Sequence, residues 1–124
     1  MTFKGNHKKK IVLFASGNGT NVENILKYFK NNIGVSFLKV FTNNSKAKVL
    51  ERILPFGIES RCFNSIEWKE DSIFKELKIL NPDLIILAGF LLKIPASIVS
   101  YFPNKIINIH PALLPHYGGK GMFG

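Results

Sequence analysis

The sequence predicts a single α/β domain with an open, mostly parallel, Rossmann-like sheet and helices on both faces. Short apolar runs that are typical of buried strands alternate with segments whose apolar residues recur at helical spacing. One run, residues 83–88 (DLIILA), is almost continuously apolar, as expected of a central strand covered on both faces. The 124 residues suit one hydrophobic core. We expect residues 1–9 to be a flexible extension and residues 10–124 to form the domain.

The first strand, loop and helix resemble the start of a βαβ unit. Residues 10–15 (KIVLFA) predict a buried strand, and residues 16–21 (SGNGTN) a glycine-containing loop. The helix that follows should end near Lys30, because apolar residues recur at helical spacing at Val22, Ile25, Leu26 and Phe29.

This glycine loop suits a phosphate, because glycines let a ligand approach the backbone and a helix N-terminus offers free amides and partial positive charge. It is not the dinucleotide fingerprint, since Val22 stands where the third glycine belongs. It is not a P-loop either, since no Gly-Lys-Ser/Thr closes it. A glycine turn that serves packing alone stays open as the alternative.

The middle of the chain continues the alternation. Residues 35–41 predict a second strand, residues 42–45 a polar loop, and residues 58–63 a third strand. A short helix between them has an apolar face of Ala47, Leu50, Ile53 and Leu54. Ser65 is a suitable N-cap for one helix that continues to Leu80, where Asn81-Pro82 breaks it. Its inward residues should be Ile66, Ile73, Leu77 and Leu80, with Trp68 covering the rim of the core.

The last predicted strand, residues 106–109, ends beside two prolines and carries polar residues. Pro95 can begin a short helix that runs to about Tyr101 before it. Asn108 and His110 are two residues apart, so a strand places both side chains on one face. An amide that donates hydrogen bonds, next to an imidazole that transfers a proton near neutral pH, suits a carbonyl that must be polarised. A satisfied structural histidine is the alternative.

Three loops should meet at one edge of the sheet, because the carboxyl ends of parallel strands share an edge. These loops are residues 16–21, 89–94 and 108–115. Ligands of open α/β sheets bind at this edge, where the strand order reverses. The convergence of the three loops therefore predicts a ligand site.

Composition narrows the class of partner. The net charge of +9 comes mostly from scattered lysines, with no arginine-rich stripe, which favours a solvated surface with a bias towards anionic substrates over a nucleic-acid groove. Because the charge is scattered, we expect no nucleic-acid partner. No segment is suited to a signal peptide or a membrane span, so we expect no membrane partner. Cys62 is the only cysteine, which fits a cytoplasmic protein, and its thiol is expected to be structural and buried.

Taken together, three segments resemble the phosphoribosylglycinamide formyltransferases, folate-dependent enzymes of purine biosynthesis. The segments are SGNGTN after the first strand, NPDLIILAGFLLKI in the middle and NIHPALLPHYGG near the end. The resemblance implies that the amine of glycinamide ribonucleotide attacks the formyl carbon of 10-formyltetrahydrofolate, the formyl-donor cosubstrate, without a metal. The products would be formylglycinamide ribonucleotide and tetrahydrofolate.

The same resemblance implies residue roles. The substrate's phosphate would be held by Gly19, Thr20 and Asn21. The glycinamide moiety would lie near Gly89 and Pro111. The folate pocket would be lined by Leu91, Leu92, Lys93, Ile94 and Asn108. Asn108 would donate to the formyl oxygen, and His110 would transfer the proton and, when protonated, stabilise the tetrahedral intermediate.

Two departures from the family accompany these roles. A basic residue near the folate's glutamate tail is expected where Ile66 stands, although Lys69 is close. The family also continues with a strand, a loop and a helix, which include an aspartate that pairs with the histidine. The resemblance implies roughly the N-terminal two thirds of a member. We therefore expect the chain by itself to be a poor catalyst, or its sequence to be incomplete.

Other functions stay open. A formyltetrahydrofolate deformylase would give the formyl group to water, although that family carries a further domain before this core. Methionyl-tRNA formyltransferase is a third relative, with a different glycine loop and a tRNA-binding domain. From another class, the chain could be a non-catalytic remnant that still binds a nucleotide. The missing third glycine disfavours a generic NAD-binding domain.

Overall fold

A computed structural model describes residues 8–109 of the chain, which form an all-parallel sheet of five strands. The strands are β1 (Lys9–Phe14), β2 (Val35–Thr42), β3 (Ser60–Cys62), β4 (Leu84–Ala88) and β5 (Ile106–Ile109). Their spatial order is β3-β2-β1-β4-β5. The chain thus builds outward from β1 to β3 and then crosses back to β4, so the strand order reverses between β1 and β4. The predicted parallel α/β sheet is confirmed.

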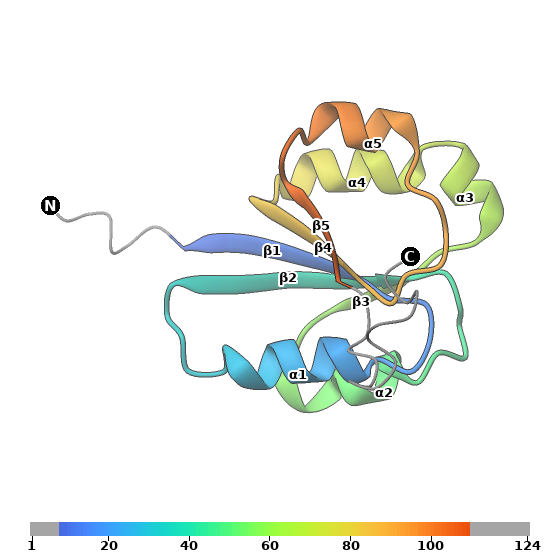
Figure 1. The fold of residues 1–124 in the computed structure, drawn as a ribbon. Helices are drawn as coiled ribbons and strands as arrows, with labels where there is room; N and C mark the ends of the chain where they lie inside the picture. The colour runs from blue at the N-terminus through green and yellow to red at the C-terminus, as the bar shows by residue number, and fades with distance from the viewer. Residues whose placement is uncertain (1–7, 110–124) are drawn as a thin grey trace, which may run out of the picture.

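Helices cover both faces of the sheet, as predicted (Figure 1). On one face lie α1 (Thr20–Tyr28) and α2 (Val49–Arg52), which is followed by the 3₁₀ helix η2 (Leu54–Phe56). On the other face lie α3 (Ser65–Lys69), α4 (Ser72–Leu80) and α5 (Ala96–Tyr101).

Successive side chains of β1 point to opposite faces of the sheet and pack into a separate hydrophobic core on each face. Ile11 and Leu13 pack on the α1 and α2 side, while Val12 and Phe14 pack on the α3–α5 side. The second core is rich in aromatic residues: Phe14 stacks on Phe41 with ring centroids 4.8 Å apart. Trp68 packs against the rim of this core, as predicted. The middle of the sheet is therefore buried on both sides, which explains why its strands read as continuous apolar runs.

The single helix predicted for residues 65–80 is wrong, because the chain forms two helices there. Asp71 has φ 62°, a left-handed conformation that ends the hydrogen-bond ladder of α3 before α4 begins. The N-cap is Asn64 and not Ser65: its side chain accepts from the Glu67 amide at 2.8 Å, while the Glu67 carboxylate accepts from the Asn64 amide at 2.9 Å. The prediction that Ile66 points inward is also wrong, since it is 62% exposed.

Smaller differences concern element ends. The strand β1 begins at Lys9, and β3 spans only three residues of the predicted 58–63. Cys62 is exposed, against the prediction of a buried thiol, because β3 is an outer strand of the described sheet and Phe63 is the residue that turns inward. Pro95 was predicted to be the first residue of a helix, but it is the N-cap of α5, which begins one residue later.

An ion-pair network joins α3 and α4 to β2 and β3. Glu76 of α4 accepts from Lys39 of β2 at 2.7 Å and from Arg61 of β3 at 2.9 Å. Arg61 also donates to Glu67 of α3 at 3.2 Å. Burial opposes the ionisation of Glu76, but the two cations outweigh it and lower its pKa. The hydrogen bond from the Asn64 amide, together with Arg61, lowers the pKa of Glu67.

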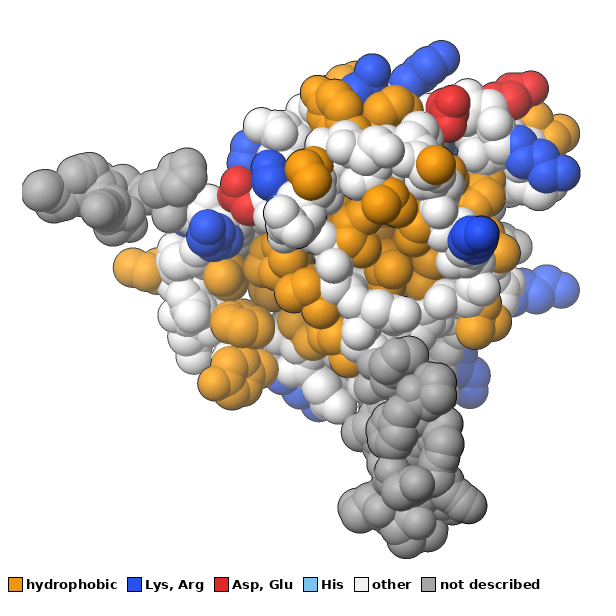
Figure 2. All heavy atoms as spheres, turned by 45° about the horizontal axis from the view of Figure 1, so that its top comes forward, with side chains coloured by type: hydrophobic (Ala, Val, Ile, Leu, Met, Phe, Trp, Pro, Cys, Tyr) orange, Lys and Arg blue, Asp and Glu red, His pale blue; other side chains and the backbone are white. Residues whose placement is uncertain are grey.

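Hydrophobic side chains gather in a hollow on the face that carries α5 and β5 (Figure 2). At the surface of these elements, Val99 of α5 is 50% exposed, and Ile107 of β5 is 46% exposed on the α1 and α2 side of the sheet. Among residues 8–109, nothing pairs with the outer side of β5. No helix in this part of the chain is both long and apolar enough to cross a membrane.

Candidate functional site

The loop after β1 turns through Gly19, which is the N-cap of α1. Gly19 has φ 81°, and a Cβ atom there would lie 2.6 Å from the Cα atom of Val49 in α2. Glycine is therefore required both for the backbone conformation and for the close approach of α2. Within the described residues, no side chain caps this helix. Among residues 8–109, nothing therefore occupies its first amides, and the phosphate contact of residues 19–21 stays a prediction.

Contacts from α2 hold the loop from behind. The Val49 amide donates to the Gly17 carbonyl at 3.1 Å, and Arg52 Nε donates to the Asn18 carbonyl at 2.7 Å. Arg52 also pairs with Glu23 in the first turn of α1 at 2.7 Å. This pair offsets the one negative charge of that turn, which would otherwise oppose an anion at the helix N-terminus.

The loops after β1 and β4 meet around a cavity of about 500 Å³ at the carboxyl edge of the sheet. The Ser16 amide donates to the Gly89 carbonyl at 3.1 Å and joins the two loops directly. The cavity is lined by Gly17, Asn18, Gly19, Thr20, Asn21, Asn24, Ala88, Gly89 and Leu91. It lies where the strand order reverses, between β1 and β4. Five of the predicted site residues, Gly19, Thr20, Asn21, Gly89 and Leu91, therefore share one cavity.

Asn108 lies at the same edge but on the other side of the sheet. It pairs in register with Leu87 of β4, one residue before Ala88. Ile106 packs in the α3–α5 core and Ile109 in the α1 core, so alternation assigns the Asn108 side chain to the α3–α5 side. Asn108 is exposed there. A ligand that contacts both the cavity and Asn108 must pass over the end of β4.

Two further residues of the loop after β4 lie on the same side of the sheet as Asn108. Leu92 and Ile94 pack against the α3–α5 core and Lys93 is exposed, so none of the three lines the cavity. His110 and Pro111, which were predicted to transfer the proton and to lie near the glycinamide, are outside the described residues. Among residues 8–109, no three His, Cys, Asp or Glu side chains are placed to hold a metal ion.

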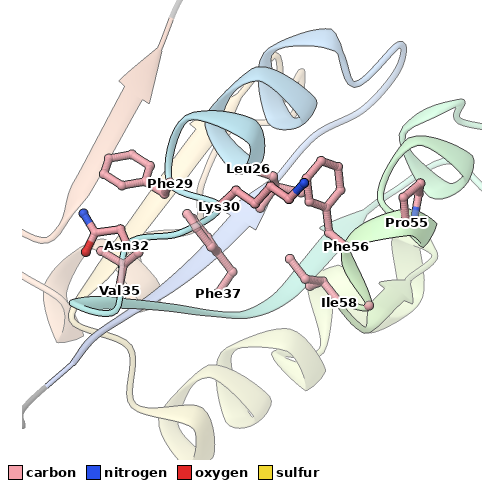
Figure 3. A pocket seen from close by; sticks show the side chains of 10 residues that line it. Leu26, Phe29, Lys30, Asn32, Val35, Phe37, Pro55, Phe56 and Ile58 are labelled. Atoms are coloured by element: carbon pink, nitrogen blue, oxygen red, sulfur yellow. The ribbon is translucent and has the colours of Figure 1, made fainter.

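A second cavity, of about 390 Å³, lies at the opposite edge, near the start of β2 (Figure 3). Most of the residues that line it are apolar, with Phe29, Phe37 and Phe56 among them. The Lys30 side chain runs from the end of α1 towards Phe56 (Figure 3). Ligands of open α/β sheets bind at the carboxyl ends of the strands, so this cavity is not the candidate site.

Sequence reasoning missed the residues that support the site from outside it. Arg52 holds the Asn18 carbonyl, and Asn43 accepts from the Ser16 hydroxyl at 2.7 Å. Asn43 follows β2, so the rule that predicted the other loops also covers it. Arg52 gives no such signal, because a lone arginine at the end of a short helix has many ordinary uses.

Comparison with known proteins identifies the family to which this chain belongs. The sequence profile of the formyl transferase family matches residues 9–123. Phosphoribosylglycinamide formyltransferase of Escherichia coli (strain K12) is 36% identical over 115 residues, covering 88% of this chain and 54% of that protein. The Bacillus subtilis (strain 168) protein of the same name is 37% identical over 122 residues, covering 94% of this chain and 63% of that protein.

Solved structures agree with the sequence matches. Glycinamide ribonucleotide transformylase 1 from Geobacillus kaustophilus superimposes with a TM-score of 0.77 at 33% identity, over 93% of this chain and 64% of that one. Phosphoribosylglycinamide formyltransferase from Brucella melitensis gives 0.78 at 29% identity, over 91% and 62%. This chain thus spans between half and two thirds of the length of these relatives. On the profile match, the identities and the shared fold, the chain belongs to the formyl transferase family.

Proposed function

We propose that this protein transfers the formyl group of 10-formyltetrahydrofolate to the amine of glycinamide ribonucleotide, a step of purine biosynthesis. The observation that carries the proposal is the cavity that residues 17–21 line together with Ala88, Gly89 and Leu91. The relatives named phosphoribosylglycinamide formyltransferase support the choice of reaction.

The phosphate of the substrate binds at the start of α1 in this proposal. Gly19, Thr20 and Asn21 offer the amides of a helix N-terminus, and Arg52 pairs with the nearby Glu23. From there the nucleotide crosses the end of β4 past Gly89, which is exposed and adds no side chain. Its amine then reaches the side of the sheet on which Asn108 lies, beside the proposed folate-binding residues Leu92 and Ile94.

The reaction joins the amine nitrogen to the formyl carbon and gives a tetrahedral intermediate. The Asn108 amide donates a hydrogen bond to the formyl oxygen as negative charge develops on it. His110 in its protonated form stabilises this intermediate and transfers a proton to the leaving nitrogen of the folate. The attacking nitrogen gives up one of its own protons, which restores the protonated form of His110, so the transfer leaves no net change on the histidine. The bond between carbon and the folate nitrogen then breaks, which releases tetrahydrofolate and the formylated nucleotide. No metal takes part.

Binding of both substrates tests the proposal. Trp68 is the only tryptophan, and its ring lies 5.6 Å from that of Phe90, just before the folate-binding residues. Titration with tetrahydrofolate should therefore change the tryptophan emission. Glycinamide ribonucleotide should bind about 100-fold more tightly than its nucleoside without phosphate, because charged hydrogen bonds at α1 are lost with the phosphate.

The identity of the product separates this reaction from its relatives. With both substrates present, formylglycinamide ribonucleotide should accumulate together with tetrahydrofolate. Formate release without the nucleotide would indicate a hydrolase instead. Equal affinity for the nucleotide and its nucleoside would show that the phosphate adds nothing to binding, which would refute the proposed phosphate site and the proposed function.

A further inference from the structure

Ser16 lies where the loops after three strands meet. It follows β1, the middle strand, so the ends of β2 and β4 flank it. Ser16 is only 5% exposed and does not line the cavity. The proposed function gives Ser16 no contact with a substrate, yet its hydroxyl forms hydrogen bonds to the loops after β2 and β4.

The Ser16 hydroxyl joins the two flanking loops. It donates to Asn43 Oδ1 at 2.7 Å, in the loop after β2, and accepts from the Leu91 amide at 2.9 Å, in the loop after β4. The donated proton fixes the direction of the hydroxyl, so its lone pairs face Leu91. The acceptor on Asn43 therefore orients the bond that Ser16 makes to Leu91.

The bond to Leu91 joins two walls of one cavity. Residues 17–21, which directly follow Ser16, form one wall, and Leu91 belongs to the other. The Leu91 side chain is 82% exposed, so packing does little to hold this residue. Gly89, two residues earlier, has φ 76°, in a region that few side chains tolerate. The Ser16 hydroxyl is thus a main restraint on where Leu91 lies.

We propose that Ser16 and Asn43 are positioning residues that set the width of the cavity between the phosphate-binding loop and the loop that leads to the folate residues. The identity of the ligands rests on the proposed function, whereas the restraint itself does not. A ligand that spans both loops depends on this width, because small displacements of a binding wall weaken every contact across it.

Amide hydrogen exchange at Leu91 tests the restraint without a ligand. The Ser16→Ala and Asn43→Ala variants should each exchange this amide about tenfold faster or more, since a hydrogen bond is lost or misdirected. Asn43→Asp, which keeps an acceptor oxygen, should restore slow exchange. Ser97→Ala is the matched control: the Ser97 hydroxyl also joins two elements, donating to Asp71 at 3.3 Å, but away from the cavity.

Ligand binding tests the consequence. Ser16→Ala should bind glycinamide ribonucleotide in the presence of tetrahydrofolate about tenfold more weakly, whereas Ser97→Ala should match the wild type. Unchanged Leu91 exchange in Ser16→Ala, or faster exchange with unchanged affinity, overturns the inference. If Ser16→Ala does not fold, Asn43→Ala decides by the same two measurements. If the wild type binds neither ligand, the proposed function fails, and the exchange of Leu91 alone decides the inference.

Discussion

Replacing Gly19 with alanine tests the packing that shapes the phosphate-binding loop. An alanine at φ 81° costs about 1–2 kcal/mol of folding free energy for the left-handed backbone. Its Cβ would lie 2.6 Å from both Cα and Cβ of Val49, and a backbone atom cannot rotate away. Overpacking of this kind adds about 1–3 kcal/mol. Gly19→Ala should therefore lower the free energy of unfolding by about 2–5 kcal/mol.

Two other glycines separate these contributions. Gly57 also has a positive φ, of 68°, but an added Cβ meets nothing within 4 Å, so Gly57→Ala should show the backbone cost alone. Gly17 has neither a positive φ nor a near neighbour, so Gly17→Ala should be close to neutral. Urea unfolding of the three variants, compared by midpoint and m-value, measures the differences. A Gly19→Ala variant as stable as Gly57→Ala would refute the close packing of α2 against this loop.

Three further predictions concern the ion pairs and the proposed chemistry. The lowered pKa of Glu76 means that its contribution to stability is present above the ordinary carboxylate pKa and is lost as pH falls through the folded value. Glu76→Gln should thus cost about 2 kcal/mol near neutral pH, allowing for partial exposure, and flatten the acid limb of a plot of urea midpoint against pH. Arg52→Met removes the hydrogen bond to the Asn18 carbonyl, so the affinity for glycinamide ribonucleotide, measured by calorimetry, should fall about tenfold. Arg52→Lys should restore little of this affinity, because one ammonium group replaces the several donors of the guanidinium. Asn108→Ala should lower kcat about 100-fold to 1000-fold with KM nearly unchanged, and an unaltered kcat would exclude it from the reaction.

Sequence reasoning recovered the order of strands and helices because apolar periodicity records burial. It failed at the helix predicted for residues 65–80, where inward positions on both sides of residue 71 were joined into one face. Two signals were present: Asn64 and Glu67 have the spacing of a capping box, and residues 69–72 (KEDS) are all polar. The left-handed conformation of Asp71 itself has no such signal, because aspartate adopts it only in a suitable tertiary context.

The candidate site was predictable in outline and not in depth. The meeting of residues 19–21 with Gly89 follows from parallel strands that share an edge. The side of the sheet on which Asn108 lies depends on the parity of its register with β4, which no local pattern encodes. Arg52 and Asn43 act through contacts between distant segments, so only the fold reveals them.

The apolar hollow beside β5 bears on how the protein should be handled. Among residues 8–109, no strand pairs with the outer side of β5, which carries the half-exposed Ile107, and such an edge is a template for association between molecules. Preparations of this chain are therefore best kept dilute and monitored by light scattering. Apparent affinities should be checked at two protein concentrations, so that aggregation is not mistaken for ligand binding.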